Sequence, residues 1–140
     1  KLGIKNLNIL YCNANISLDT WLSNIEIGQI RRVTIQFPDP WFKRKHFKRR
    51  VLQKNLINSI AKSMSADGEI FIQSDILKLI EYMTYTIDKS RYFNKKDLGE
   101  LSFIDKNPYN VKTDRELFSL KKNLPIYRAM YLRNSLSFIT

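Results

Sequence analysis

The apolar and polar residues of this 140-residue chain follow two periodic patterns, and together these patterns predict strands that alternate with helices. Short runs of β-branched and aromatic residues are typical of strands, whereas apolar residues spaced three and four positions apart are typical of helices. The first pattern predicts strands at 7–12, 32–37, 69–74 and 126–133. The second pattern predicts helices at 19–27, 46–64, 76–89 and 114–122.

The predicted helix 46–64 carries the clearest apolar stripe of the chain. Its members should face a core, and they are Val51, Leu52, Leu56, Ile60 and Met64. A turn is expected at 66–68. The segment 91–113 is expected to be irregular because it combines a glycine and a proline with several Asn and Asp residues.

The alternation of strands and helices predicts an α/β fold with a mostly parallel sheet. A chain of 140 residues is long enough for one domain with a single core. In such folds ligands bind beyond the carboxyl ends of the strands. Asn13, Asp39 and Asp75 each follow a predicted strand, so we expect them to lie on one rim of the sheet.

The most informative segment is 37–50, which reads F-P-D-P-W-F-K-R-K-H-F-K-R-R. Proline fixes its own φ and keeps the preceding residue extended, so Asp39, placed between two prolines, should project from a stiff loop. Trp41 follows, and a rigid acid with an aromatic ring beside dense positive charge is typical of a site that acts on a nucleic-acid base while holding its phosphates. The cations of the segment are Lys43, Arg44, Lys45, Lys48, Arg49 and Arg50.

Several of these residues also have a local explanation. Asp39 could cap a turn, and Trp41 could pack on the core instead of stacking on a base. Asp75 could cap the helix that follows it. Thr113 and Glu116 have the spacing of a capping box at the start of the last helix.

The net charge indicates a class of partner. Lys and Arg number 24 against 13 acids, which gives a formal charge of +11 at pH 7. Such an excess favours a polyanionic partner, most often nucleic acid and less often an acidic membrane surface.

Cations at the start of the predicted helix 46–64 conflict with the positive end of the helix dipole, and a bound phosphate would resolve that conflict. A basic segment that is only solvated is the alternative.

Several classes of protein are not expected. Cys12 is the only cysteine, so no intrachain disulfide can form, and its apolar neighbours suggest a buried side chain in a reducing cytoplasm. No apolar run approaches the roughly 20 residues of a membrane span. His46 is the only histidine and has no cysteine nearby, so a metal site is not expected. The sequence contains no P-loop, no G-x-G-x-x-G and no Ser/His/Asp pattern.

Segment 37–50 resembles the signature of bacterial tRNA (guanine-N7)-methyltransferases, in which F-P-D-P-W precedes a basic run that ends in K-R-R. The runs I-Q-F-P-D-P-W-F-K and F-I-Q-S-D are most similar to cyanobacterial members. The pair Asn13-Ala14 and the segments 68–75 and 111–131 also resemble family elements, in the same order. The resemblance therefore covers nearly the whole chain.

The resemblance implies a Rossmann-like class I fold and the activity of a tRNA (guanine(46)-N7)-methyltransferase. Such an enzyme moves a methyl group from S-adenosylmethionine to a guanosine in the variable loop of tRNA. The resemblance implies that Asp39 is the active-site acid and also lies against the methyl donor. It implies that Asn13 binds the donor, at a position that is often Asp in relatives.

The expected contacts with the RNA follow from the same resemblance. Lys43 would contact the RNA substrate. Asp75, Thr113 and Glu116 would line the guanosine site. The remaining cations would hold the RNA backbone, and they are Arg44, Lys45, Lys48, Arg49 and Arg50.

The front of the chain departs from the family pattern. Family members begin with a strand, a glycine-rich loop and a second strand, and residues 1–6 match none of these. The chain is therefore interpreted as the carboxyl-terminal part of one methyltransferase domain over residues 1–140, with a fold that lacks the first two strands and the glycine-rich loop. We expect it to bind the donor poorly and to be inactive by itself.

Two other interpretations use the same basic segment. A non-catalytic RNA-binding module is the main alternative. A peripheral membrane protein is disfavoured because the cations cluster in a loop and a helix start, not along one face of a helix. The expected partner is tRNA in the cytoplasm, without a membrane, and the protein is expected to be a monomer or a homodimer.

Overall fold

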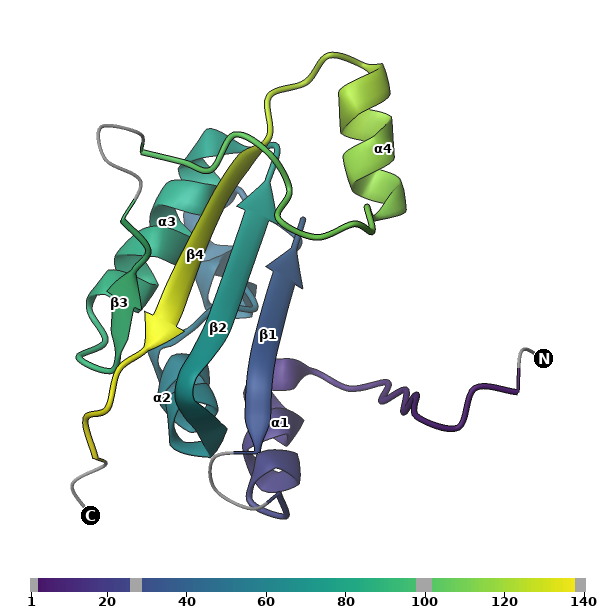
Figure 1. Ribbon diagram of the computed structural model, residues 1–140. Coiled ribbons are helices and arrows are strands. Elements are labelled where there is room, and N and C mark those ends of the chain that lie inside the picture. Colours follow the sequence, from purple (N-terminus) through teal and green to yellow (C-terminus); the bar gives the residue numbers. More distant parts are fainter. Residues whose placement is uncertain (1–2, 26–28, 98–101, 138–140) are drawn as a thin grey trace.

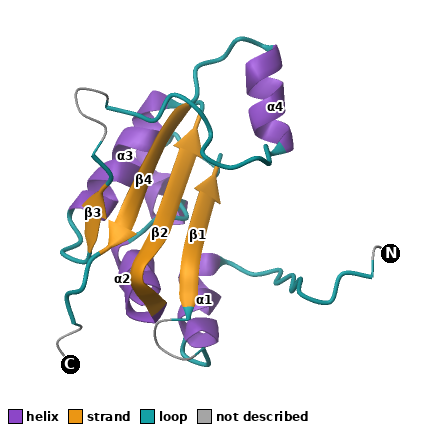
Figure 2. Ribbon diagram, viewed as in Figure 1, coloured by secondary structure: helices purple, strands orange, loops and turns teal. Residues whose placement is uncertain are grey.

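The computed structural model describes residues 3–25, 29–97 and 102–137. Most of the helices pack on one side of a four-stranded sheet, which confirms the α/β fold class (Figure 1; Figure 2). The elements are α1 (Ala14–Leu22), β1 (Ile30–Gln36), the 3-10 helix η1 (Arg44–Arg49), α2 (Lys54–Ser63), β2 (Met64–Ser74), α3 (Leu77–Asp88), β3 (Phe93–Lys95), α4 (Asp114–Lys121) and β4 (Tyr127–Arg133).

The strands lie in the order β1-β2-β4-β3. β1 and β2 are parallel, whereas β4 runs antiparallel to both β2 and β3. Among the described strands only one pair is therefore parallel, and the expectation of a mostly parallel sheet is wrong for this part of the chain. The reason is visible in Figure 1: α4 stands beyond the carboxyl end of β2, so the chain re-enters the sheet from that edge and β4 must run back.

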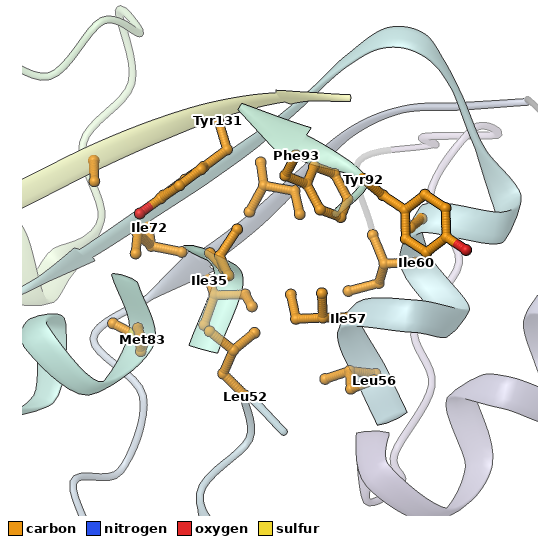
Figure 3. Close-up of a cluster of buried hydrophobic side chains, with 14 of the residues drawn as sticks. Ile35, Leu52, Leu56, Ile57, Ile60, Ile72, Met83, Tyr92, Phe93 and Tyr131 are labelled. Atoms are coloured by element: carbon orange, nitrogen blue, oxygen red, sulfur yellow. The ribbon is translucent and has the colours of Figure 1, made fainter. Parts of the chain in front are cut away.

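One face of the sheet packs on α1, α2 and α3, and this interface is the hydrophobic core (Figure 3). Successive strand residues point to opposite faces, so the alternate positions Ile70 and Ile72 of β2 both enter the core and are fully buried. Tyr131 of β4 lies on the same face and is also fully buried. The stripe predicted for 46–64 reaches this core through Leu52, Leu56, Ile60 and Met64, with Val51 partly buried against it.

The opposite face of the sheet is covered near its centre by a loop. Phe71 and Met130, which pair across β2 and β4, are buried there although they are outside the helix-side core. The ring of Tyr109 meets that of Phe71 edge to face, with centroids 5.1 Å apart. The segment predicted to be irregular therefore has a packing role, and it also contains the short strand β3, which the sequence pattern did not predict.

The strand predicted at 7–12 does not form. Residues 3–12 contain no helix or strand, they are exposed, and they run away from the sheet in Figure 1. A strand requires a neighbour for its backbone hydrogen bonds, and no described strand lies beside this segment. Cys12 is exposed as a consequence, so the expectation of a buried cysteine is also wrong.

Two predicted helices have different bounds in the structure. α1 begins at Ala14, five residues before the predicted start, because Asn13 caps it: Asn13 Oδ1 accepts a hydrogen bond from the Asn15 N–H at 3.0 Å. The helix predicted at 46–64 is divided into η1 and α2, with extended residues between them. α3, α4, β1 and β4 lie within one or two residues of their predicted bounds.

The turn predicted at 66–68 lies inside β2, at an irregularity in its pairing with β1. Asp67 has a φ of 62°, and Gly68 packs directly on Met64, whose Cγ would be 2.3 Å from a Cβ at position 68. The predicted turn is therefore a bulge-like kink inside the strand, and glycine suits it because a Cβ at position 68 would collide with the Met64 side chain.

Candidate functional site

The loops that carry Asp39 and Asp75 leave the sheet at the same edge. Gln36 at the end of β1 pairs with Gln73 of β2, and the Phe37 N–H donates to the Gln73 carbonyl at 2.8 Å. Because β1 and β2 are parallel and in register, the loops that follow them both leave the sheet at the carboxyl ends of the strands. α4 stands at the same edge (Figure 2). This edge is the place where α/β folds bind their ligands.

Asp39 is an accessible carboxylate on a strained loop. Phe37 and Trp41, which flank the Pro-Asp-Pro unit, have φ values of 47° and 42°. Such values are unfavourable for bulky residues and are found most often at functional sites. Asp39 is exposed, and in the described part of the chain its only hydrogen bond is a long one, 3.4 Å from the Trp41 N–H to Oδ1. A turn cap this weak leaves the carboxylate free to accept stronger donors.

Trp41 packs inside the basic loop. Its ring meets that of His46 edge to face at 5.6 Å, and the Arg49 guanidinium lies 5.1 Å from the Trp41 ring centroid. The side chain is half-buried and is not a member of the hydrophobic core. The indole therefore organises the loop and orients Arg49, and the alternative of a core tryptophan is wrong.

The basic loop, defined here as residues 42–50, presents most of its cations to solvent. Lys43, Arg44, Lys45, Lys48 and Arg49 are exposed. Arg50 differs, because it is only 7% exposed and its Nε donates to the Pro40 carbonyl at 2.9 Å. Arg50 therefore anchors the loop and is far less exposed than the neighbouring cations.

The basic loop does not begin α2, so the argument from the helix dipole was wrong. η1 ends at Arg49, and the Gln53 side-chain amide then donates to the carbonyls of Phe47 and Arg50 at 3.1 and 2.9 Å. These bonds satisfy the carbonyls at the end of η1 and let the chain extend before α2 starts at Lys54. The cations thus lie one segment before the helix whose start they were predicted to occupy.

Asn13 lies beside the basic loop. The Asn15 side-chain amide donates to the Arg50 carbonyl at 3.1 Å, which ties the start of α1 to the end of the loop. Asn13, Asn15, Arg49 and Val51 line a common pocket. The structure therefore places Asn13 beside Arg49 of the basic loop, but Asn13 caps α1 and does not follow a strand as the sequence predicted.

Asp75 is tied to α4. Its Oδ2 accepts hydrogen bonds from Arg115 Nη2 at 2.5 Å and from Ser119 Oγ at 3.3 Å, and its side chain is only 8% exposed. The alternative role for Asp75, a cap on α3, is wrong because Ser74 Oγ accepts the Ile76 N–H instead. Asp75 therefore couples the end of β2 to the helix that closes the rim.

Thr113 caps α4 as predicted, but the Glu116 side chain bonds to other residues and does not complete the predicted capping box. Thr113 Oγ1 accepts the Glu116 N–H at 3.2 Å. The Glu116 carboxylate is fully buried and points toward the sheet, where Arg128 Nη2 donates to Oε1 at 2.8 Å. Asn107 Nδ2 and Gln73 Nε2 donate to the other oxygen at 2.7 and 3.3 Å. Glu116 is thus the centre of a polar cluster.

Three members of that cluster were not predicted. Gln73 receives the Arg128 Nε–H at 3.1 Å and donates to Gln36 Oε1 at 2.6 Å, so the ends of β1, β2 and β4 are joined side by side. Arg128 also donates to the Asp105 carbonyl at 2.7 Å. The one signal in the sequence was a charged residue inside the apolar run 126–131, which indicates a buried partner. Asn107 lies in the segment predicted to be irregular and gave no signal.

The cluster keeps Glu116 ionised. Burial alone raises the pKa of Glu116, but the hydrogen bonds from Arg128, Asn107 and Gln73 and the charge of Arg128 outweigh it, so its pKa lies below the usual 4.5. Glu116 is therefore a carboxylate at neutral pH, fully occupied by its neighbours. It positions α4 and Thr113, and both of its carboxylate oxygens are already bonded to neighbouring side chains.

A pocket of about 440 Å³ opens beside this cluster. Lys106, Asn107, Lys112, Glu116 and Arg128 line its polar side. Its volume is in the range of small-ligand sites. Among the described residues no group of three or more His, Cys, Asp or Glu could hold a metal ion, and no described helix is long and apolar enough to cross a membrane.

Residues 1–129 match the profile of a protein family described as "Putative methyltransferase". The chain is 72% identical over 138 residues to the tRNA (guanine-N(7)-)-methyltransferase of Prochlorococcus marinus NATL1A and 69% identical to that of strain NATL2A. Each match covers 99% of this chain and 64% of the relative. The identity to the protein of the same name from Nostoc sp. PCC 7120 is 43%, over 96% of this chain and 61% of the relative. The chain thus spans a little under two thirds of the length of these relatives.

Proposed function

The chain belongs to the family described as "Putative methyltransferase", and we propose that it contributes the acceptor side of a tRNA (guanine-N7)-methyltransferase. The described α/β sheet is part of the Rossmann-like fold of class I methyltransferases. The proposed methyl donor is S-adenosylmethionine, and the proposed acceptor is N7 of a guanosine in the variable loop of tRNA. The names of the relatives from Prochlorococcus and Nostoc support this choice of substrate.

One observation carries the proposal: a nearly unengaged carboxylate, Asp39, stands at the carboxyl edge of the sheet beside a loop of exposed cations. The strained backbone at Phe37 and Trp41 holds that carboxylate out of the fold. The neighbouring cations suit a polyanion, because each phosphate contact releases counterions from the nucleic acid. A rigid acid for the base and a positive surface for the backbone are what the proposed reaction requires.

The chemistry demands few catalytic groups. Guanine N7 has a free lone pair, so no base is needed to deprotonate it before methyl transfer. When bound, S-adenosylmethionine supplies a methyl group on a positively charged sulfur. Asp39 accepts hydrogen bonds from the N1–H and amino edge of the guanine and stabilises the positive charge of the methylated base. Orientation of the acceptor by Asp39 and the basic loop then accounts for most of the rate increase.

The residues present fit part of a donor site. Asn13 is exposed beside Arg49 and can offer its side-chain amide to an adenine, although Oδ1 also caps α1. Asp39 is also exposed. The sequence contains no glycine-rich G-x-G-x-x-G loop, so we expect the affinity of these 140 residues for the donor to be low.

The RNA contacts are proposed in two groups. Lys43, Arg44, Lys45, Lys48 and Arg49 hold the backbone from the exposed surface of the basic loop. Thr113 lies at the rim and is partly accessible, so it is proposed to contact the guanosine directly. Asp75 and Glu116 are proposed to support the guanosine site without a direct contact, because Asp75 is paired with Arg115 and Glu116 with Arg128.

An exchange experiment tests the function. In the Prochlorococcus marinus NATL1A relative, the matched segment is replaced by this chain, and transfer of a labelled methyl group to tRNA is measured. The chimera should methylate guanine N7 at a rate within about tenfold of the unmodified relative, since 72% of the exchanged positions are identical. A chimera that folds and binds tRNA but transfers no methyl group would contradict the proposal. Calorimetry of the 140-residue chain with S-adenosylmethionine tests the expected weak binding separately.

A further inference from the structure

A further groove lies between the basic loop and the first turns of α3. We call it the Phe42 groove and define it by Phe42, Phe47, Arg50, Lys78, Leu79 and Tyr82. Its volume is about 590 Å³, enough for a nucleotide. Pro40 also lines it, so the groove begins next to Asp39. None of the roles proposed above uses its aromatic residues.

The floor of the Phe42 groove is a guanidinium held between two rings. The Arg50 guanidinium carbon lies 3.8 Å from the ring centroid of Phe47 and 4.6 Å from that of Tyr82. Its Nε is fixed by the Pro40 carbonyl. With respect to the described residues, its two Nη atoms have no hydrogen-bond partner, although Arg50 is only 7% exposed. Since no buried side-chain nitrogen or oxygen among the described residues lacks a hydrogen-bond partner, these Nη atoms reach solvent in the groove and can donate to an anionic ligand.

The walls of the groove suit a nucleotide. Phe42 is 70% exposed, which is unusual for a large apolar side chain with no partner in the core, and its ring can stack on a base. Lys78 is exposed on the first turn of α3 and carries a second positive charge. α3 begins without a side-chain cap, so its free N–H groups add to the positive potential there. Glu81 is the one acid that lines the groove.

We infer that the Phe42 groove binds a nucleotide of the RNA that neighbours the methylated guanosine. The base stacks on Phe42, and the phosphate meets Lys78 and the Nη edge of Arg50. This inference rests on the proposed function, and it adds a second subsite that holds the strand while Asp39 engages the target base. A base must leave its stack to be reached, and a subsite for its neighbour stabilises that opened strand. An apolar peptide would leave the Arg50 donors unused, so the charge of the groove favours RNA.

Binding of tRNA to the 140-residue chain, measured over a range of salt concentrations without methyl donor, tests the inference. Phe42→Ala should weaken binding by roughly tenfold through loss of one stacked base and leave the salt dependence unchanged. Lys78→Ala should lower the slope of log Kd against log salt by about 0.7, the value for one single-strand phosphate contact. Tyr85→Ala and Lys89→Ala, in α3 and at its end, are the matched controls because both lie outside the groove, and they should bind as the wild type does.

The outcomes separate this inference from the proposed function. If wild-type chain binds tRNA and the Phe42 and Lys78 variants bind with unchanged affinity and slope, the subsite is wrong while the methyltransferase proposal stands. An equal loss in the Tyr85 and Lys89 controls would also overturn it, because the effect would then be general. If the wild-type chain binds no tRNA at any salt concentration, the subsite is also wrong, whereas the methyltransferase proposal is decided by methyl transfer in the chimera.

Discussion

Glu116 of α4 and Arg128 of β4 form a buried ion pair in which Arg128 Nη2 donates to Glu116 Oε1 at 2.8 Å. The Glu116 side chain is 0% exposed and that of Arg128 is 5% exposed. The pair joins the helix at the rim to the centre of the sheet. It therefore controls the position of α4, and through Thr113 and Asp75 the shape of the candidate site.

Removal of one partner should be costly. Arg128→Met leaves the Glu116 charge buried without its main partner, and we expect the free energy of unfolding to fall by about 3–5 kcal/mol. Urea unfolding measures the loss. Arg32→Met is the matched control, since Arg32 of the Arg32–Glu69 pair is exposed to solvent and the pair should contribute much less. Equal losses in the two variants would show that the buried pair has no special role.

The same pair predicts a dependence of stability on pH. The pKa of Glu116 is lower in the folded chain than the ordinary 4.5, so its ionised form stabilises the fold above pH 4.5, and this contribution is lost as the pH falls through the folded pKa. The difference in free energy of unfolding between wild type and Glu116→Gln should be constant near neutral pH and should shrink below 4.5. A difference that grows on acidification would have the wrong sign.

Asp39 should matter for transfer more than for binding. In the chimera with the Prochlorococcus relative, Asp39→Asn should lower the rate of methyl transfer by about a hundredfold or more, because a preorganised charge is lost, while tRNA affinity changes little. Asp67→Asn is the control, since Asp67 is exposed in the kink of β2. Wild-type rates in Asp39→Asn would remove this carboxylate from catalysis.

The exposed cations of the basic loop should show the opposite pattern. Lys43→Ala or Arg49→Ala should weaken tRNA binding and lower the slope of log Kd against log salt by about 0.7–0.9 each, as one phosphate contact is lost. Lys62→Ala removes an exposed cation from the last turn of α2 and should leave the slope unchanged. Filter binding over a salt series measures all three variants. Identical slopes for the loop variants and Lys62→Ala would mean that the loop has no specific contact.

Asn13 should have two separable roles. Asn13→Ala removes the N-cap of α1 and should cost about 1 kcal/mol of stability, whereas Asn13→Asp is an equally good cap and should cost little. Thermal unfolding measures this difference. If Asn13 also contacts the donor, the affinity of the chimera for S-adenosylmethionine should change in Asn13→Asp although its stability does not. An unchanged donor affinity would restrict Asn13 to capping.

Local patterns in the sequence determined most of the elements. The period of two in 32–37 and 126–133 and the helical spacing in 76–89 depend only on nearby residues, and β1, β4 and α3 formed where these patterns predicted. The cap at Thr113 is also local, since its hydrogen bond reaches only to Glu116. The stiffness of the Pro-Asp-Pro unit is likewise covalent, so the exposed position of Asp39 could be predicted from three residues.

Tertiary structure decided the features that depend on distant partners. The apolar run 7–12 is exposed because a strand without a neighbour gains no backbone hydrogen bonds. The helix predicted at 46–64 is interrupted because the Arg50 side chain donates a hydrogen bond to the Pro40 carbonyl. The Arg50 carbonyl also accepts a hydrogen bond from the Asn15 side-chain amide, 35 residues away. The Glu116 carboxylate points toward the sheet because Arg128 of β4 donates to it there. Periodicity cannot report such contacts, since each depends on which surfaces the folded chain brings together.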